Sequence, residues 1–308
     1  MRIVFMGTPQ FAVPCLERIL ADGHQVAGVY TQPDKPQGRG YHLAAPPVKE
    51  LALREGIPVW QPASFREEGA VQALRQLAPE VIVVVAYGRI LPEEVLAIPP
   101  KGCINVHASL LPKYRGAGPI QWSVINGEQE TGVTTMYMEK GLDTGDMILS
   151  AATPIGPEET AGQLQERLAQ LGAQVLSITL KLVEEGKAPR TRQEDALSSY
   201  APMLEKELGR LDYEKPAAQL HNLIRGLAPS PGAFTMLDGK RLKIHAARVA
   251  EGFSGQPGML LDDRRLIVGC GEGALELLEV QLEGSKRMNG EDFLRGKRLK
   301  IGKMFTTH

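Results

Sequence analysis

The pattern of apolar and polar positions alternates between two periods along the first 186 residues. Short apolar runs predict strands at 2–7, 24–31, 79–88, 103–107 and 132–138. Stretches with apolar residues every three or four positions predict helices at 11–23, 46–56, 67–77 and 160–186. Strands that alternate with helices predict an α/β fold with a doubly wound, mostly parallel sheet.

The pattern changes after Gly186. A polar stretch without clear periodicity indicates a linker, and residues 214–227 predict a short helix. Further short strands are then predicted at 241–249, 258–262, 265–271 and 274–282, separated by turns that contain glycine or aspartate. Such a series favours a small β-barrel. The predicted organisation is a first domain at 1–189, a linker at 190–206 and a second domain at 207–308.

Composition places the chain among globular proteins. It has 308 residues, of which 43% are hydrophobic, which is enough for two domains with sizeable cores. No apolar run reaches the roughly 18 residues that a membrane span needs, and no signal-peptide pattern opens the chain. The three cysteines lack disulfide or metal-site spacing. We therefore expect a cytoplasmic protein that does not enter membranes.

Charge is unevenly distributed although the net charge is only −1. From Glu207 to the end there are 16 basic and 13 acidic residues, and the segment Lys286–Lys303 alone has seven basic and two acidic ones. This indicates a basic patch on the second domain. A surface that serves only solubility is the alternative.

Two further features suggest a binding site. The proline-rich segment 32–47 is much longer than the roughly 2–6 residues of most strand-to-helix loops, so it is either functional or mobile. The apolar strand 103–107 ends with Asn105 and His107, which share one face because they are two positions apart. Ligands bind beyond the carboxyl ends of parallel strands. Two hydrogen-bonded core side chains remain the structural alternative.

The segment 139–148 adds carboxylates, because its glycine-rich loop carries Asp143 and Asp146. An amide, an imidazole and a carboxylate without a motif-type nucleophile suggest direct acyl transfer, with Asn105 and His107 donating to an oxyanion. The carboxylate and the imidazole would handle the proton of an amine. Ser109 lacks the G-x-S-x-G turn of a nucleophile. The chain also lacks G-x-G-x-x-G after its first strand, a Walker sequence and clustered metal ligands.

Four stretches resemble the folate-dependent formyltransferases, above all the members that act on methionyl-tRNA. They read FMGTPQFAVPCL, TQPDKPQGRG, INVHASLLPKYRGAGPIQWSVINGE and GLDTGDMI, and a weaker likeness continues in LHNLIRGLAPSPGAF. The resemblance implies a Rossmann-like catalytic domain that uses 10-formyltetrahydrofolate as formyl donor and no metal. It implies that Asn105, His107 and Asp143 are catalytic. The folate contacts that it implies are Ser109, Leu110, Leu111 and Pro112, together with Arg89, Ile90 and Leu91 in YGRILP.

The resemblance also implies the acceptor. In these proteins it is the methionine of initiator methionyl-tRNA, and the second domain is an OB-like barrel, a fold suited to nucleic acid. The loop with Arg39 resembles an insertion that reaches the acceptor stem. The basic C-terminal segment supplies further tRNA-binding candidates, which are Lys286, Arg287, Lys297, Arg298 and Lys300. We expect a monomer.

Three alternatives stay open. A glycinamide ribonucleotide formyltransferase typically lacks the second domain and the long loop. An amino-sugar formyltransferase shares much of the architecture and the folate donor, so it is the closer rival. A tRNA-binding module without catalysis is a third possibility, although Asn105, His107 and Asp143 are all present.

Overall fold

The computed structural model describes residues 1–37 and 42–306. The chain forms two compact units that interleave along the sequence. The first unit comprises 1–116, 132–153 and 165–200, and the second comprises 117–131, 154–164 and the chain from 201 onward. The chain last passes from one unit to the other between Tyr200 and Ala201, within the segment that the sequence predicts as a linker. Among the described residues, no helix combines the length and apolarity that crossing a bilayer requires.

The first unit is built on one seven-stranded sheet with the order β10-β9-β7-β6-β1-β2-β5. The pairs from β5 to β7 are parallel, whereas β9 runs antiparallel to β7. The fold is therefore α/β with a mostly parallel sheet, as predicted. The strands are β1 (Arg2–Gly7), β2 (Gln25–Tyr30), β5 (Val59–Trp60), β6 (Val81–Val85), β7 (Cys103–His107), β9 (Glu130–Tyr137) and β10 (Met147–Pro154).

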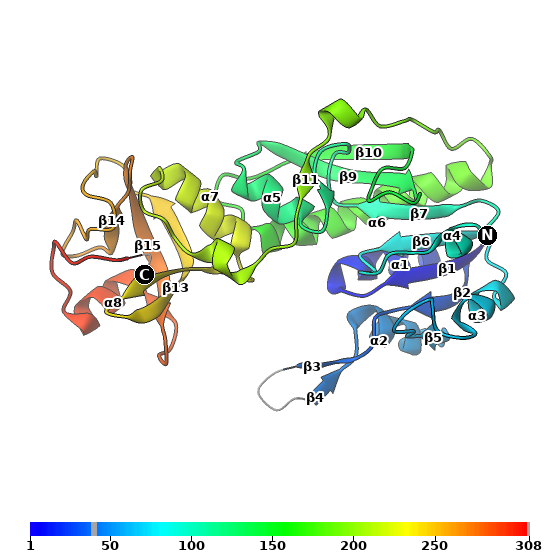
Figure 1. The fold of residues 1–308 in the computed structure, drawn as a ribbon, viewed down its shortest axis with the longest axis horizontal. Helices are drawn as coiled ribbons and strands as arrows, with labels where there is room; N and C mark the ends of the chain where they lie inside the picture. The colour runs from blue at the N-terminus through cyan, green and yellow to red at the C-terminus, as the bar shows by residue number, and fades with distance from the viewer. Residues whose placement is uncertain (38–41, 307–308) are drawn as a thin grey trace. The chain divides into compact units, whose positions relative to one another are not determined.

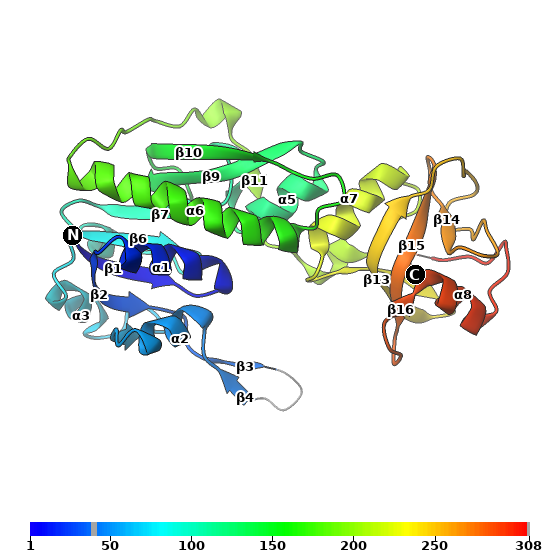
Figure 2. The ribbon, with the colours of Figure 1, turned by 180° about the vertical axis from the view of Figure 1, so that it is seen from behind.

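Helices cover this sheet. Figure 2 shows α1 and α6 along the same side of the strands. A Cβ added to Gly172 of α6 would lie 3.1 Å from the side chain of Val106, so glycine lets this helix approach β7 closely. Leu74 and Val95 join a separate apolar cluster with Val4 and Met6 of β1. The helices are α1 (Val13–Ala21), α2 (Pro47–Arg54), α3 (Ala70–Gln76), α4 (Glu93–Leu96) and α6 (Ala161–Glu184).

Shorter elements complete the first unit. The long loop after β2 contains two paired strands, β3 (Lys35–Gln37) and β4 (His42–Ala44), which the sequence pattern did not predict. β10 was likewise not predicted. The remaining pieces are β8 (Arg115–Gly116), which pairs with β11 (Tyr200–Ala201), and 3-10 turns at Gln10–Ala12 and Asp195–Leu197. A third 3-10 turn, Lys206–Gly209, lies in the second unit.

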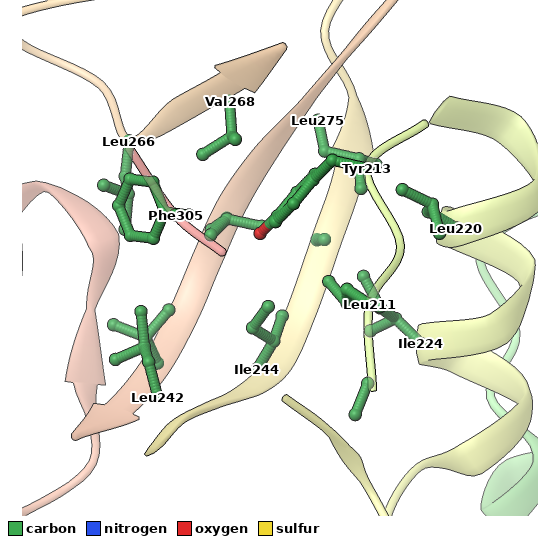
Figure 3. Close-up of a cluster of buried hydrophobic side chains, with 14 of the residues drawn as sticks. Leu211, Tyr213, Leu220, Ile224, Leu242, Ile244, Leu266, Val268, Leu275 and Phe305 are labelled. Atoms are coloured by element: carbon green, nitrogen blue, oxygen red, sulfur yellow. The ribbon is translucent and has the colours of Figure 1, made fainter. Parts of the chain in front are cut away.

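The second unit contains a smaller antiparallel sheet with the order β12-β13-β15-β14, and β16 pairs with β15. Figure 3 shows its core, where Leu220 and Ile224 of α7 meet side chains from the strands. The strand predicted at 258–262 is wrong, because only isolated bridges form there. The elements are β12 (Ala233–Leu237), β13 (Lys240–Val249), β14 (Ile267–Gly269), β15 (Ala274–Leu282), β16 (Met288–Asn289), α5 (Pro119–Ile125), α7 (Ala217–Leu227) and α8 (Gly290–Lys297).

Contacts with α7 explain why residues 117–131 and 154–164 belong to the second unit, although they precede it in the sequence. A Cβ added to Gly226 of α7 would lie 2.5 Å from Ile125, so this glycine allows α7 to pack against α5. The buried Arg225 donates from Nη1 to the carbonyl oxygens of Gly156 and Glu159, each at 3.0 Å. These hydrogen bonds hold the segment 154–164 against α7.

Candidate active site

The strand β7 presents two polar side chains from a buried position. Asn105 and His107 are only 9% and 6% exposed. β7 lies between β6 and β9, so its backbone is paired on both sides and the two side chains project from one face. Burying an amide or an imidazole without a hydrogen-bond partner costs free energy, so Asn105 and His107 require polar partners nearby.

The third group, Asp143, arrives by an unexpected route. Because β9 is antiparallel to β7, β9 ends beside Ile104, at the beginning of β7 rather than at its carboxyl end. The loop 138–146 then folds back, so that Asp143 reaches Asn105 and Gly116. Asp143 has a φ of 53°, in the left-handed region. A Cβ added to Gly145 would lie 1.8 Å from the carbonyl oxygen of Tyr137, so glycine is required for this tight return.

The three predicted catalytic side chains converge. Nδ2 of Asn105 donates to Oδ1 of Asp143 over 3.4 Å. Oδ2 of Asp143 lies 3.7 Å from Nδ1 of His107 and accepts a 2.9 Å hydrogen bond from the backbone N–H of Gly116. The structure thus brings together residues that are 38 positions apart.

A backbone carbonyl fixes the orientation of the imidazole. Nε2 of His107 lies 2.8 Å from the carbonyl oxygen of Tyr114. Because a carbonyl oxygen only accepts, Nε2 carries the proton, and Nδ1 is the nitrogen that faces Asp143. Tyr114 itself has a φ of 60°, and its N–H donates to Oγ of Ser199 at 2.9 Å.

Nearby nucleophiles are not available for covalent chemistry. Oγ of Ser109 donates to the carbonyl oxygen of Lys113 at 2.6 Å, and Ser109 is fully buried. Burial raises the pKa of the Cys103 thiol to about 12, so this thiol stays protonated at neutral pH. The arrangement is suited to direct transfer rather than to a covalent intermediate.

The predicted folate contacts separate into buried and exposed residues. Leu111 is 7% exposed, and its N–H donates to Oγ1 of Thr134. Leu91 is 5% exposed and belongs to an apolar cluster of the first unit, whereas Ile90 is 89% exposed. Leu110 is half-buried, Pro112 is partly buried, and Arg89 is exposed. Ile90 is therefore open to solvent, whereas Leu91 packs inside the first unit.

Polar side chains at the ends of neighbouring strands hold the turn before Ile90 in place. Nε2 of Gln32 donates to the carbonyl oxygens of Tyr87 and Gly88, at 3.1 and 2.8 Å. Oγ1 of Thr8 also donates to Tyr87, at 3.2 Å. Sequence reasoning missed these residues, since one glutamine in a long loop gives no signal until the fold assembles its partners.

The predicted tRNA contacts lie in the second unit, except Arg39, which lies outside the described residues. Arg287 forms an ion pair with Glu279. Lys297 occupies the last turn of α8, where a cation also offsets the helix dipole. The exposed members of the set are Lys286, Arg287, Lys297, Arg298 and Lys300.

A second basic surface was not predicted. The residues that line a hollow of about 550 Å³ include Arg210, Arg241 and Lys243, together with the acidic Glu283. The guanidinium of Arg241 lies 4.0 Å from the centre of the Phe234 ring. Arg241 and Lys243 lie on the same strand, β13, whereas Arg210 follows the 3-10 turn Lys206–Gly209 and forms an isolated bridge with Phe234 of β12.

Comparison with known proteins decides the family. The family model described as "Formyl transferase" matches residues 1–180, and "Formyl transferase, C-terminal domain" matches residues 203–298. The chain belongs to the formyl transferase family. Two relatives are named methionyl-tRNA formyltransferase. The one from Caldanaerobacter subterraneus subsp. tengcongensis is 54% identical over 98% of this chain and 99% of its own length. The one from Geobacter sulfurreducens is 52% identical over 98% of this chain and 96% of its own length.

Two solved structures of other formyltransferases share the fold. An N-formyltransferase from Helicobacter canadensis, in complex with folinic acid and dTDP-3-aminofucose, has a TM-score of 0.69 at 21% identity and covers 89% of this chain and 98% of its own. WlaRD, a sugar 3N-formyl transferase, has a TM-score of 0.69 at 20% identity and covers 93% of this chain and 99% of its own. At this identity the likeness extends to the fold alone.

Proposed function

We propose that this protein transfers the formyl group of 10-formyltetrahydrofolate to the amino group of methionine on initiator methionyl-tRNA. The observation that carries the proposal is the convergence of Asn105, His107 and Asp143 in a chain that matches methionyl-tRNA formyltransferases over nearly its full length. The described residues contain no group of three or more His, Cys, Asp or Glu side chains that could hold a metal ion. The monomeric state and the cytoplasmic location stay predictions.

The proposed mechanism follows from the hydrogen-bond geometry of Asn105, His107 and Asp143. The methionine amine attacks the formyl carbon, and the formyl oxygen gains negative charge. Asn105 can donate to this oxygen from its amide. Because Nε2 of His107 is engaged by Tyr114, His107 can donate only through a protonated Nδ1, as an imidazolium. The Asp143 carboxylate lies 3.7 Å from this nitrogen.

The reaction also moves a proton and releases the folate as the leaving group. A new carbon–nitrogen bond forms to methionine, and the bond between the formyl carbon and the folate nitrogen breaks. The amine loses a proton, for which the Asp143 carboxylate is the nearest base to Asn105 and His107. The folate nitrogen gains a proton, so the products are tetrahydrofolate and formylmethionyl-tRNA.

A panel of acceptors tests the function against its rivals. Purified protein with 10-formyltetrahydrofolate is given charged initiator tRNA, free methionine, a nucleotide-linked amino sugar or glycinamide ribonucleotide. We expect a kcat/KM for charged initiator tRNA that exceeds the others by orders of magnitude. Preferred formylation of the amino sugar would assign the protein to the rival branch, and no formylation of any acceptor would favour a binding module.

Substitutions at Ile90 and Leu91 are expected to have different effects, one on folate binding and the other on stability. Ile90→Asp changes an exposed side chain, so we expect folding to be unaffected and the KM for folate to rise about tenfold, from the loss of roughly 1.5 kcal/mol of apolar contact. Leu91→Asp buries a charge, so we expect a loss of thermal stability instead. An unchanged KM in Ile90→Asp would remove this residue from the folate site.

The salt dependence of tRNA use tests the basic C-terminal segment. Phosphate contacts release counterions, so kcat/KM for tRNA should fall steeply with salt. Lys297→Ala combined with Lys300→Ala should lower the slope of log kcat/KM against log salt by about 1 to 2. Lys181→Ala with Lys187→Ala removes the same charge from exposed positions of the first unit and should leave the slope unchanged. Equal slopes for wild type and Lys297/Lys300 variant would contradict the assignment. We also propose that Arg39 contacts the acceptor stem of the tRNA, near the methionine that is formylated.

A further inference from the structure

The segment 190–199 is hydrogen-bonded to both parts of the chain that surround His107 and Asp143. Thr191 and Met147 exchange two backbone hydrogen bonds of 2.9 Å, beside the end of the Asp143 loop. At the other end, Ser199 accepts from the N–H of Arg115 through its carbonyl and from the N–H of Tyr114 through Oγ. The segment therefore belongs to the first unit and borders the site at two points.

Gln193 is the buried side chain in the middle of this segment, and it is 5% exposed. Its Nε2 donates to the carbonyl oxygens of Asp143 and Gly145, each at 2.8 Å. Its Oε1 accepts from Nε of Arg115 at 3.0 Å. Both donors and one acceptor lone pair are used, and only this orientation of the amide satisfies all three partners.

The hydrogen bonds from Gln193 hold the loop backbone at Asp143, which has an unfavourable conformation. Asp143 is a non-glycine residue with a φ of 53°, which persists only where the surroundings hold it. Arg115 and Gly116 are adjacent: the N–H of Gly116 orients the Asp143 carboxylate, and the side chain of Arg115 engages Gln193. One glutamine thus couples the backbone of the Asp143 loop to the segment that orients its carboxylate.

We propose that Gln193 is a positioning residue for formyl transfer, which holds the Asp143 carboxylate beside Asn105 and His107 through the loop backbone. The inference rests on the proposed function, because it assumes that Asp143 takes part in the reaction. Displacement of a reacting group by about 1 Å can cost about 10²-fold in rate.

The test compares single and double variants under saturating substrates. Gln193→Ala should lower kcat by about 10- to 100-fold with little change in the KM for folate or tRNA. In an Asp143→Asn background, the same change should lower kcat less than twofold further, because the group being positioned is already disabled. Gln174→Ala replaces an exposed glutamine of α6 in the same unit and should retain wild-type kcat.

A second variant tests the two donors directly. Gln193→Glu preserves size and the contact with Arg115 but faces two carbonyl oxygens without N–H groups, so we expect it to be as slow as Gln193→Ala. If Gln193→Ala does not fold, Gln193→Glu still tests the positioning role. Wild-type kcat in Gln193→Glu, or a Gln193→Ala penalty that is fully retained in the Asp143→Asn background, overturns the positioning role. Wild-type kcat in Asp143→Asn alone overturns the proposed catalytic set instead.

Discussion

Replacement of Asn105 or His107 by alanine is expected to lower kcat for formyl transfer by about 10²–10³-fold in each case. Each change removes one of the two donors that we propose for the negative charge on the formyl oxygen. Both side chains are buried at the end of β7. Hydrogen bonds in a low-dielectric interior are stronger than in water. The KM for folate should change little, because these donors act most strongly in the transition state.

Steady-state kinetics on folded protein measure this effect. His24→Ala is a suitable control, because His24 lies between α1 and β2 in the same unit, away from the site. The melting temperature of each variant shows how much of any loss is unfolding. Turnover within a few-fold of wild type in either Asn105→Ala or His107→Ala would contradict the oxyanion role.

Replacement of Asp143 by asparagine is expected to lower kcat by about 10²-fold or more while the protein still binds both substrates. An asparagine oxygen can still accept from the Gly116 N–H, so the loop should keep its shape. The change removes the negative charge beside Nδ1 of His107, and with it the proposed base.

Asp146→Asn is the matched control on the same loop. Asp146 lies 3.4 Å from Nη1 of Arg190 and is not among the groups that face His107, so only a mild effect is expected. Equal losses of kcat in Asp143→Asn and Asp146→Asn, or unfolding of Asp143→Asn with full activity per folded molecule, would assign Asp143 a structural role.

Features that depend on residues close together in the sequence could be predicted from the sequence. Two polar side chains two positions apart in an apolar strand identified Asn105 and His107 as neighbours on one face, and the structure has them so. The α/β class followed from alternating periods, and α6 appears close to its predicted bounds. These predictions succeeded because burial of one face fixes the period of apolar residues.

What the sequence could not supply depends on backbone groups and long-range contacts. The carbonyl of Tyr114 and the N–H of Gly116 orient His107 and Asp143, and backbone atoms have no residue signature. Gln193 looked like part of a polar linker, because its partners lie 50 residues away. The interleaving of the two units also escaped notice, since it rests on close packing at Gly226 and on the buried Arg225.

The most direct test of the central claim is a rapid-quench single turnover with 10-formyltetrahydrofolate labelled in the formyl group and excess enzyme with charged initiator tRNA. We predict that label moves from folate to the methionine amino group in one phase, with none on the protein at any time. That phase should be about 10²-fold slower or more in Asn105→Ala. Label that passes through the protein, or label that never reaches the methionyl-tRNA, would contradict direct transfer by Asn105, His107 and Asp143.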